Sequence, residues 1–208
     1  MNFDNNFKNL ENDLTIAIIS FLLIFIARSF AQIKNINIFI VFFMEILSIL
    51  IIIIYLYKNK EININSIFNK KNIMYIVIGF ILMRIVAILF TIIGDTIFHE
   101  HRSLNDSNII KHRNLLEGLR LLEYMFYIGI VSPIREEFVY RYLIICKIGD
   151  MKKEYILISA ILCGFVHKSN NIIHFLMYFL MSIILSITYY RAKRLDINIL
   201  IHMLNNIL

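Results

Sequence analysis

The sequence predicts an all-α fold, a polytopic transmembrane helix bundle of about seven spans. Of the 208 residues, 59% are hydrophobic and only 17% are charged, whereas soluble domains average about 45–50% and about 25%. A soluble globule of this length cannot bury so much apolar surface, because its surface-to-volume ratio is too high. The apolar residues also form long runs between charged segments. These observations exclude the soluble, fibrous and disordered classes.

Three apolar runs open the chain, at residues 14–27, 36–57 and 73–94. The second and third have about 22 residues each, which makes a helix of roughly 33 Å, long enough to cross a bilayer. Glu45 and Arg84 interrupt them. Each must face the bundle or a partner, because lipid does not solvate a charge.

Four more runs follow a polar connection, at residues 124–145, 155–166, 172–190 and 197–208. The second and fourth of these would form helices of roughly 18 Å, too short to cross a bilayer comfortably alone. Short spans are tolerated where they line a cavity. We therefore predict one integral-membrane domain over residues 1–208.

The cations indicate how the bundle is oriented. With residues 124–145 as one crossing, eleven Lys and Arg lie on the side of the N-terminus and six on the other. Because cytoplasmic loops carry the excess of Lys and Arg, the N-terminus is predicted to face the cytoplasm, in a bacterial plasma membrane. Two crossings within residues 115–147 would favour the opposite orientation. The net charge of +6 thus indicates contact with the lipid bilayer, and no nucleic-acid partner is expected.

The predicted fourth span contains an unusual charged segment, SPIREEFVYR at residues 132–141. Charges within a span are costly, so a specific need must keep them there. On a helix, Glu137 and Arg141 share one face and can pair. Glu136 points about 100° away, without that partner, and is a candidate general base. A structural ion pair and a transporter's proton relay are the alternatives.

Two later runs carry further polar groups. His167 follows the run 155–166, and His202 and Asn206 share one helix face in the last run. A buried His beside an amide supplies two donors for an oxyanion, although such pairs also join helices in membrane bundles. Counted along each helix from one membrane side, these groups and Glu136 all lie roughly 9–18 Å deep. We therefore predict that one water-filled pocket contains them.

These residues resemble the motifs of the CPBP family, the CAAX-protease, abortive-infection and bacteriocin-processing membrane proteins. The family's first motif, two Glu with an Arg four positions after the second, is matched by Glu136, Glu137 and Arg141. Its second motif has a Phe four residues before a His. His167 fits this motif, and Cys163 stands where Phe is usual.

The third motif is a His followed four residues later by an Asn, matched by His202 and Asn206. The three motifs occur in the family's order and all within predicted spans, which makes the match fairly specific. The resemblance implies a CAAX-protease-like catalytic core at residues 124–208, preceded by N-terminal spans at residues 1–123.

The resemblance further implies an intramembrane endopeptidase acting on a peptide or small membrane-associated protein. Glu136 would activate a water that His167 helps to hold, and His202 with the Asn four residues later would stabilise the oxyanion. Glu137 and Arg141 would order the site. Having Cys163 in place of the usual Phe should matter least, because that Phe would supply packing and not chemistry.

Several alternatives stay open from the sequence. No cofactor is expected, but Glu136, His167 and His202 are the set that would bind zinc if the site were metal-dependent. The chain lacks an HExxH pattern, and Arg141 would repel a dication. The family resemblance makes bacteriocin or pheromone maturation, or bacteriocin immunity, plausible roles. A non-catalytic immunity protein and a proton-coupled transporter are the rival classes.

Overall fold

The computed structural model describes residues 3–33, 36–63 and 66–208, and helix is the regular structure found throughout these ranges. Four of its helices are long and apolar enough to cross a membrane: α1 (Phe3–Ala31), α2 (Ile38–Lys58), α3 (Lys70–Phe98) and α8 (Ile172–Ala192). The all-α fold is confirmed, and the protein is an integral membrane protein. The count of about seven spans stays a prediction.

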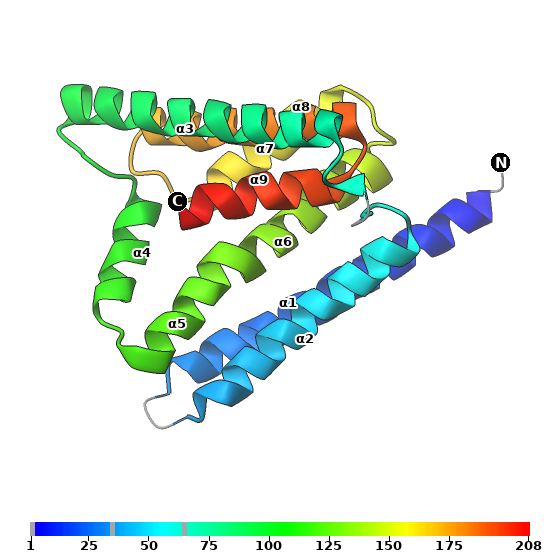
Figure 1. Cartoon of the computed structure of the whole chain (residues 1–208), viewed down its shortest axis with the longest axis horizontal. Coiled ribbons are helices and arrows are strands. Elements are labelled where there is room, and N and C mark those ends of the chain that lie inside the picture. Colours follow the sequence, from blue (N-terminus) through cyan, green and yellow to red (C-terminus); the bar gives the residue numbers. More distant parts are fainter. Residues whose placement is uncertain (1–2, 34–35, 64–65) are drawn as a thin grey trace.

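The other elements complete a layered bundle. They are α4 (Leu104–Asn114), α5 (Gly118–Phe126), η2 (Tyr127–Val131), α6 (Ser132–Glu137), η3 (Phe138–Ile148), α7 (Glu154–Val166) and α9 (Leu195–Ile207). Figure 1 shows α1 and α2 as one antiparallel pair, α3 with α8 as a second layer, and α9 between them. The polar helix α4 joins the end of α3 to α5.

The elements α5, η2, α6 and η3 follow one another as one long helix, which we call the central helix (residues 118–148). No turn interrupts it, as expected for a single crossing. Two of its parts, η2 and η3, have the wider π-helical geometry. The first ends at Val131, two residues before Pro133, whose ring would clash with the carbonyl of residue 129 in a regular α-helix. A π segment at such a point absorbs the mismatch and is common at functional sites.

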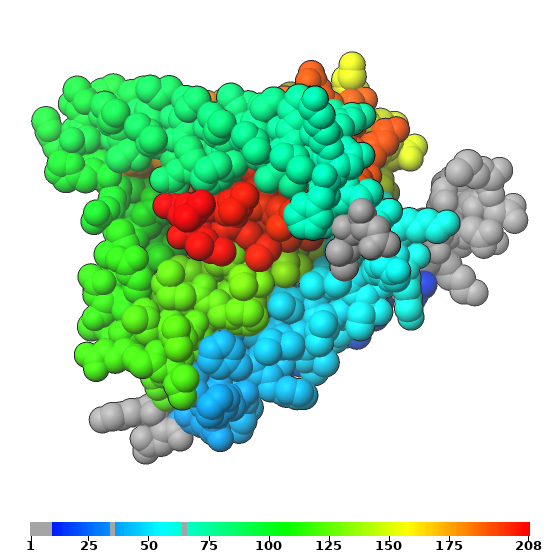
Figure 2. All heavy atoms as spheres, viewed as in Figure 1, coloured from blue at the N-terminus to red at the C-terminus, as the bar shows by residue number. Residues whose placement is uncertain are grey.

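The two short helices, α7 and α9, have 13 residues each, which corresponds to roughly 20 Å. Figure 2 shows α9 between α3 and the central helix. The start of α9 is held by the connection after α2. There Leu195 N–H donates to Glu61 O at 3.0 Å, and Asn63 N–H donates to Asp196 Oδ2 at 2.9 Å. These bonds fix where α9 begins relative to α2.

A buried ion cluster ties the first two helices to the central helix. Glu45 is 0% exposed, and its Oε1 accepts from Arg28 Nη1 at 3.0 Å. Arg28 also pairs with Glu123 of α5 and lies 4.3 Å from the Tyr127 ring centroid. Glu45 thus faces the bundle, as predicted from the cost of a charge in lipid.

Candidate active site

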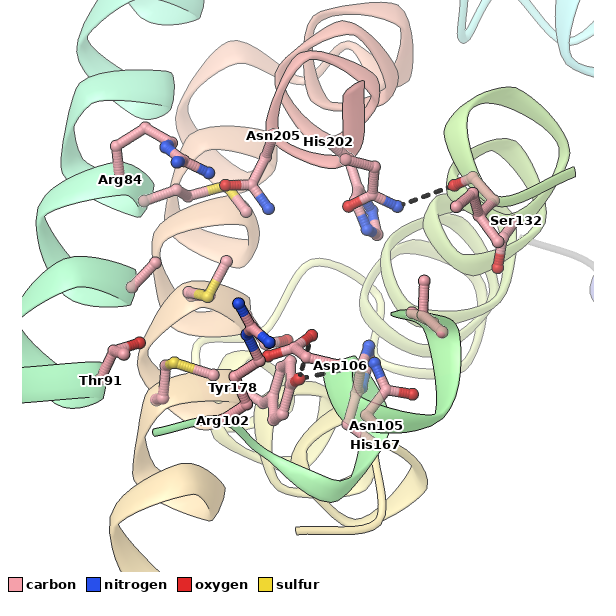
Figure 3. A pocket seen from close by; sticks show the side chains of 18 of the residues that line it. Arg84, Thr91, Arg102, Asn105, Asp106, Ser132, His167, Tyr178, His202 and Asn205 are labelled. Atoms are coloured by element: carbon pink, nitrogen blue, oxygen red, sulfur yellow. Dashed lines mark hydrogen bonds between the residues drawn. The ribbon is translucent and has the colours of Figure 1, made fainter. Parts of the chain in front are cut away.

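A cavity of about 740 Å³ lies between α3, α4, the central helix and α7 to α9 (Figure 3). Its volume is within the range of about 300–1,000 Å³ typical of ligand sites. Glu136, His167, His202 and Asn206 all line it. The groups that the sequence places at one depth therefore meet in one cavity, while their catalytic roles stay predictions.

Glu136 is the carboxylate that faces the cavity. Its Oε1 accepts a hydrogen bond from Ser132 Oγ at 2.6 Å, one helical turn earlier. Its Oε2 lies 3.8 Å from Nε2 of His167 and 3.8 Å from Nε2 of His202. Among the described residues, this buried oxygen has no hydrogen-bond partner. A separation of 3.8 Å is too long for a direct hydrogen bond and suits groups that share one water.

His167 is held by one hydrogen bond and by stacking of its ring. It caps the C-terminus of α7, and its Nδ1 lies 2.8 Å from the carbonyl oxygen of Cys163. A carbonyl only accepts, so Nδ1 carries a proton and Nε2 is turned toward Glu136. The imidazole stacks on Tyr178, with ring centroids 4.4 Å apart. Cys163 thus orients His167 through its backbone, and a Phe at this position is not required for that bond.

Glu137 turns away from Glu136 and joins three helices behind the cavity. Its Oε1 accepts from Arg141 Nη1 at 3.1 Å and lies 2.8 Å from His202 Nδ1, while its Oε2 accepts from Asn198 Nδ2 at 3.3 Å. Arg141 Nη2 donates to Ser182 Oγ at 2.9 Å. Glu137 and Arg141 are both 0% exposed. This network fixes the orientation of His202, because a carboxylate accepts and Nδ1 must therefore donate.

Asn206 reaches the cavity from the end of α9, and its amide has a specific partner. Its Nδ2 donates to the carbonyl oxygen of Ile128 at 2.9 Å. In the local π register, Ser132 N–H bonds to Tyr127 O, five residues back. By the same register Ile128 O would accept from residue 133, which is a proline without an N–H. Asn206 therefore satisfies the carbonyl that Pro133 leaves free, and its second amide hydrogen is left over.

Sequence reasoning did not single out several residues of this site. Ser132 and Asn198 each lie four residues before a predicted site residue on the same helix, so the helical spacing could have found them. Tyr178 and Ser182 reach the site from α8, and no local pattern marks them. Asn205 also lines the cavity, and its buried Oδ1 has no hydrogen-bond partner in the described part of the chain.

The zinc alternative can be compared with the geometry. Across the described residues, no group of three or more His, Cys, Asp and Glu side chains is gathered as a metal ion requires. Glu136, His167 and His202 converge, but Arg141 also lies close behind them through Glu137. The sequence names these three as the possible zinc ligands, and whether the site uses a metal stays a prediction.

Comparison with known proteins is informative for the C-terminal part of the chain. Residues 119–208 match the family model described as type II CAAX prenyl endopeptidase Rce1-like. This match confirms the resemblance to the CPBP family over a segment that contains all six predicted catalytic residues. No curated protein and no solved structure matches the chain.

Proposed function

We propose, because residues 119–208 match the Rce1-like model, that this protein is an intramembrane endopeptidase that uses Glu136 to activate water. One observation carries the proposal. Glu136 Oε2 is a buried acceptor that lies 3.8 Å from each of two histidine Nε2 atoms inside one cavity. A water bound among these three atoms would be oriented by the histidines and deprotonated by the carboxylate.

The reaction follows from these positions. Glu136 takes one proton from the water as its oxygen attacks the carbonyl carbon of the scissile peptide bond. His167 Nε2 orients the water, and its Nδ1–H bond to the Cys163 carbonyl holds the imidazole in this tautomer. As the tetrahedral intermediate collapses, the C–N bond breaks. The protonated Glu136 then returns its proton to the leaving amine, so no proton is left over.

The oxyanion of the intermediate also needs hydrogen-bond donors. His202 presents Nε2 to the cavity while Nδ1 is engaged by Glu137. When Nε2 is protonated, it donates to the oxyanion, and the second amide hydrogen of Asn206 is the other available donor. Preorganised donors of this kind are worth roughly 10²–10³ in rate each. Glu137 and Arg141 are positioning residues that act through His202.

The substrate we propose is a peptide or a small membrane-associated protein. The cavity wall formed by α3 and α8 carries Met83, Ala87, Ile88, Met177 and Met181, which suits apolar side chains. Maturation of a bacteriocin or pheromone, or immunity to a bacteriocin, would use such a substrate. The reaction needs no metal in this proposal, and a bilayer surrounds the site.

The test compares matched glutamate variants. The purified chain in detergent is incubated with quenched fluorescent peptides with apolar cores, and cleavage products are identified by mass spectrometry. We expect Glu136→Gln to lower kcat by a factor on the order of 10² or more, while Glu117→Gln, on an exposed residue outside the cavity, retains activity. Full biological activity in Glu136→Gln, His167→Ala and His202→Ala would favour a binding protein instead. Proton-coupled uptake into vesicles that Glu136→Gln abolishes would favour a transporter.

We further propose that the N-terminus faces the cytoplasm of a bacterial plasma membrane, from the excess of cations on that side. Single cysteines placed in the connections after α2 and after α3, in a chain without its own cysteines, can be labelled from outside intact cells. We expect labelling after α3 and none after α2. The reverse pattern would invert the orientation.

A further inference from the structure

Arg84 occupies the middle of α3, with fourteen residues of helix on either side within Lys70–Phe98. The helix contains a window with a mean hydropathy of 2.8 and is a candidate span. At 1.5 Å per residue, Arg84 lies roughly 21 Å from each helix end. A charge at such depth costs at least about 2.5–3.5 kcal/mol and marks a functional position by default.

Nothing in the described part of the chain neutralises this charge. Arg84 forms no ion pair or hydrogen bond with the residues that the structure describes. Arg28, the basic residue in the last turn of α1, is by contrast paired with Glu45 and Glu123. The two acidic residues that line the cavity have other partners, because Glu136 accepts from Ser132 and Asp106 accepts from Tyr178. An architectural role through a salt bridge therefore does not explain Arg84.

The placement of Arg84 points to the substrate. It lines the same cavity as Glu136, and Figure 3 shows it on α3 near Asn205 of α9, across the cavity from Ser132 of the central helix. Asn205 adds a buried Oδ1 without a hydrogen-bond partner among the described residues on the same side. One cation, Arg84, thus lies across the cavity from the helix that carries the reacting carboxylate. Arg84 also lies outside residues 119–208, so the family match does not account for it.

We propose that Arg84 binds a carboxylate of the peptide substrate, from its C-terminus or from an acidic side chain, and so selects the bond that reaches Glu136. The guanidinium presents a planar fork of N–H donors that matches a carboxylate in a bidentate pair. A lipid phosphate is the less suitable ligand, because phosphates lie at the membrane surface and Arg84 lies roughly 21 Å from either end of its helix. The inference rests on the proposed peptidase activity and adds its specificity.

The experiment measures kcat and KM for one apolar peptide in four forms: with a free or amidated C-terminus, and with or without one acidic side chain. Losing a charge-assisted pair should raise KM roughly 10- to 100-fold for the form that carries the recognised carboxylate. We expect wild type to discriminate against the neutral form by this factor and Arg84→Met to lose the discrimination. Arg84→Lys should recover part of it. The carboxylate whose neutralisation raises KM, either the C-terminus or the acidic side chain, is the one that Arg84 binds.

Controls separate this role from others. Arg113→Met removes an exposed arginine at the end of α4 and should leave KM unchanged. Equal discrimination by wild type and Arg84→Met would overturn the proposal, as would an equal loss of kcat on charged and neutral peptides, which indicates a structural role. If phosphatidylglycerol nanodiscs change activity through Arg84 while peptide charge has no effect, the ligand is a lipid headgroup and the proposal is wrong.

A binding measurement keeps this inference separate from the proposed catalysis. Fluorescence anisotropy with labelled peptide is recorded on Glu136→Gln, with and without Arg84→Met. If Arg84→Met weakens carboxylate-dependent peptide binding roughly tenfold or more, the role of Arg84 in binding the carboxylate is supported even if wild type cleaves no peptide. In that case the peptidase proposal fails and the binding site stands. Hydrolysis by wild type without carboxylate-dependent binding would instead support the peptidase and overturn the role of Arg84.

Discussion

Replacing Glu137 by Gln tests the geometry behind the cavity, because this change removes one charge and almost no volume. Glu137 and Arg141 are both 0% exposed and 3.1 Å apart. Removing one partner of a buried ion pair strands the other charge and costs about 3–5 kcal/mol. The bond to Asn198 adds only about 0.6 kcal/mol, the average for such bonds between membrane helices. We therefore expect Glu137→Gln to lower the free energy of unfolding by about 3–5 kcal/mol and to reduce kcat, since His202 loses its anionic acceptor.

The measurement is an equilibrium unfolding titration in detergent, run together with peptide cleavage. Adding Arg141→Met to Glu137→Gln removes the stranded charge, so the double variant should recover about 2 kcal/mol or more of stability while activity stays low. Glu117→Gln is the control, an exposed residue of the same chemistry. If the free energy of unfolding of Glu137→Gln is within about 1 kcal/mol of the wild-type value and the variant keeps full activity, the buried network does not hold His202 and the reasoning is refuted.

Four shorter predictions follow from other parts of the structure. Cleavage should continue in EDTA or 1,10-phenanthroline at about 1 mM, and activity that is lost and then restored by zinc would contradict a metal-free site. Asn206→Ala should lower the free energy of unfolding by about 1 kcal/mol. Adding Pro133→Ala to this variant should recover part of the loss, because it restores an N–H near Ile128 O. The measurement is an unfolding titration, and a double variant no more stable than Asn206→Ala would argue against the pairing of Asn206 with this carbonyl. Cys163→Ala should retain cleavage within about threefold, because the backbone carbonyl rather than the thiol orients the imidazole. Burial raises the pKa of Glu61 in the folded protein, so the stability that this residue contributes at low pH is lost as the pH rises through the raised pKa. The melting temperature of Glu61→Gln minus that of wild type should therefore increase from about pH 4 upward. A difference that does not change with pH would contradict this prediction.

Much of the candidate site was predictable because charges inside membrane spans are rare. Glu136 and Glu137 stand out in the apolar sequence, and helical spacing alone assigns Arg141 to the second of them, as the structure confirms. Local spacing says nothing about which helix faces which. The bond from His202 to Glu137 joins residues 65 positions apart, and it depends on how α9 crosses the central helix.

Asn206 shows how a local pattern can miss a function in the fold. Its spacing from His202 predicts a shared helix face, and both residues do line the cavity. The sequence could not indicate that its amide bonds to Ile128 O, because that bond arises from a π segment and a proline on another helix. Whether its second hydrogen serves an oxyanion stays a prediction.

The sequence by itself determined that this chain lies in a membrane, that its elements are helices, and that a few polar residues within them need a reason. Those conclusions depend on composition and on the cost of placing a charge in lipid, which act residue by residue. Only the tertiary structure decided which polar residues are satisfied and which are free to act. Glu45 pairs with Arg28, and Glu137 pairs with Arg141 and His202. Arg84 lines the same cavity as Glu136. Those outcomes depend on distances between helices far apart in the chain, which are set by packing across the whole bundle.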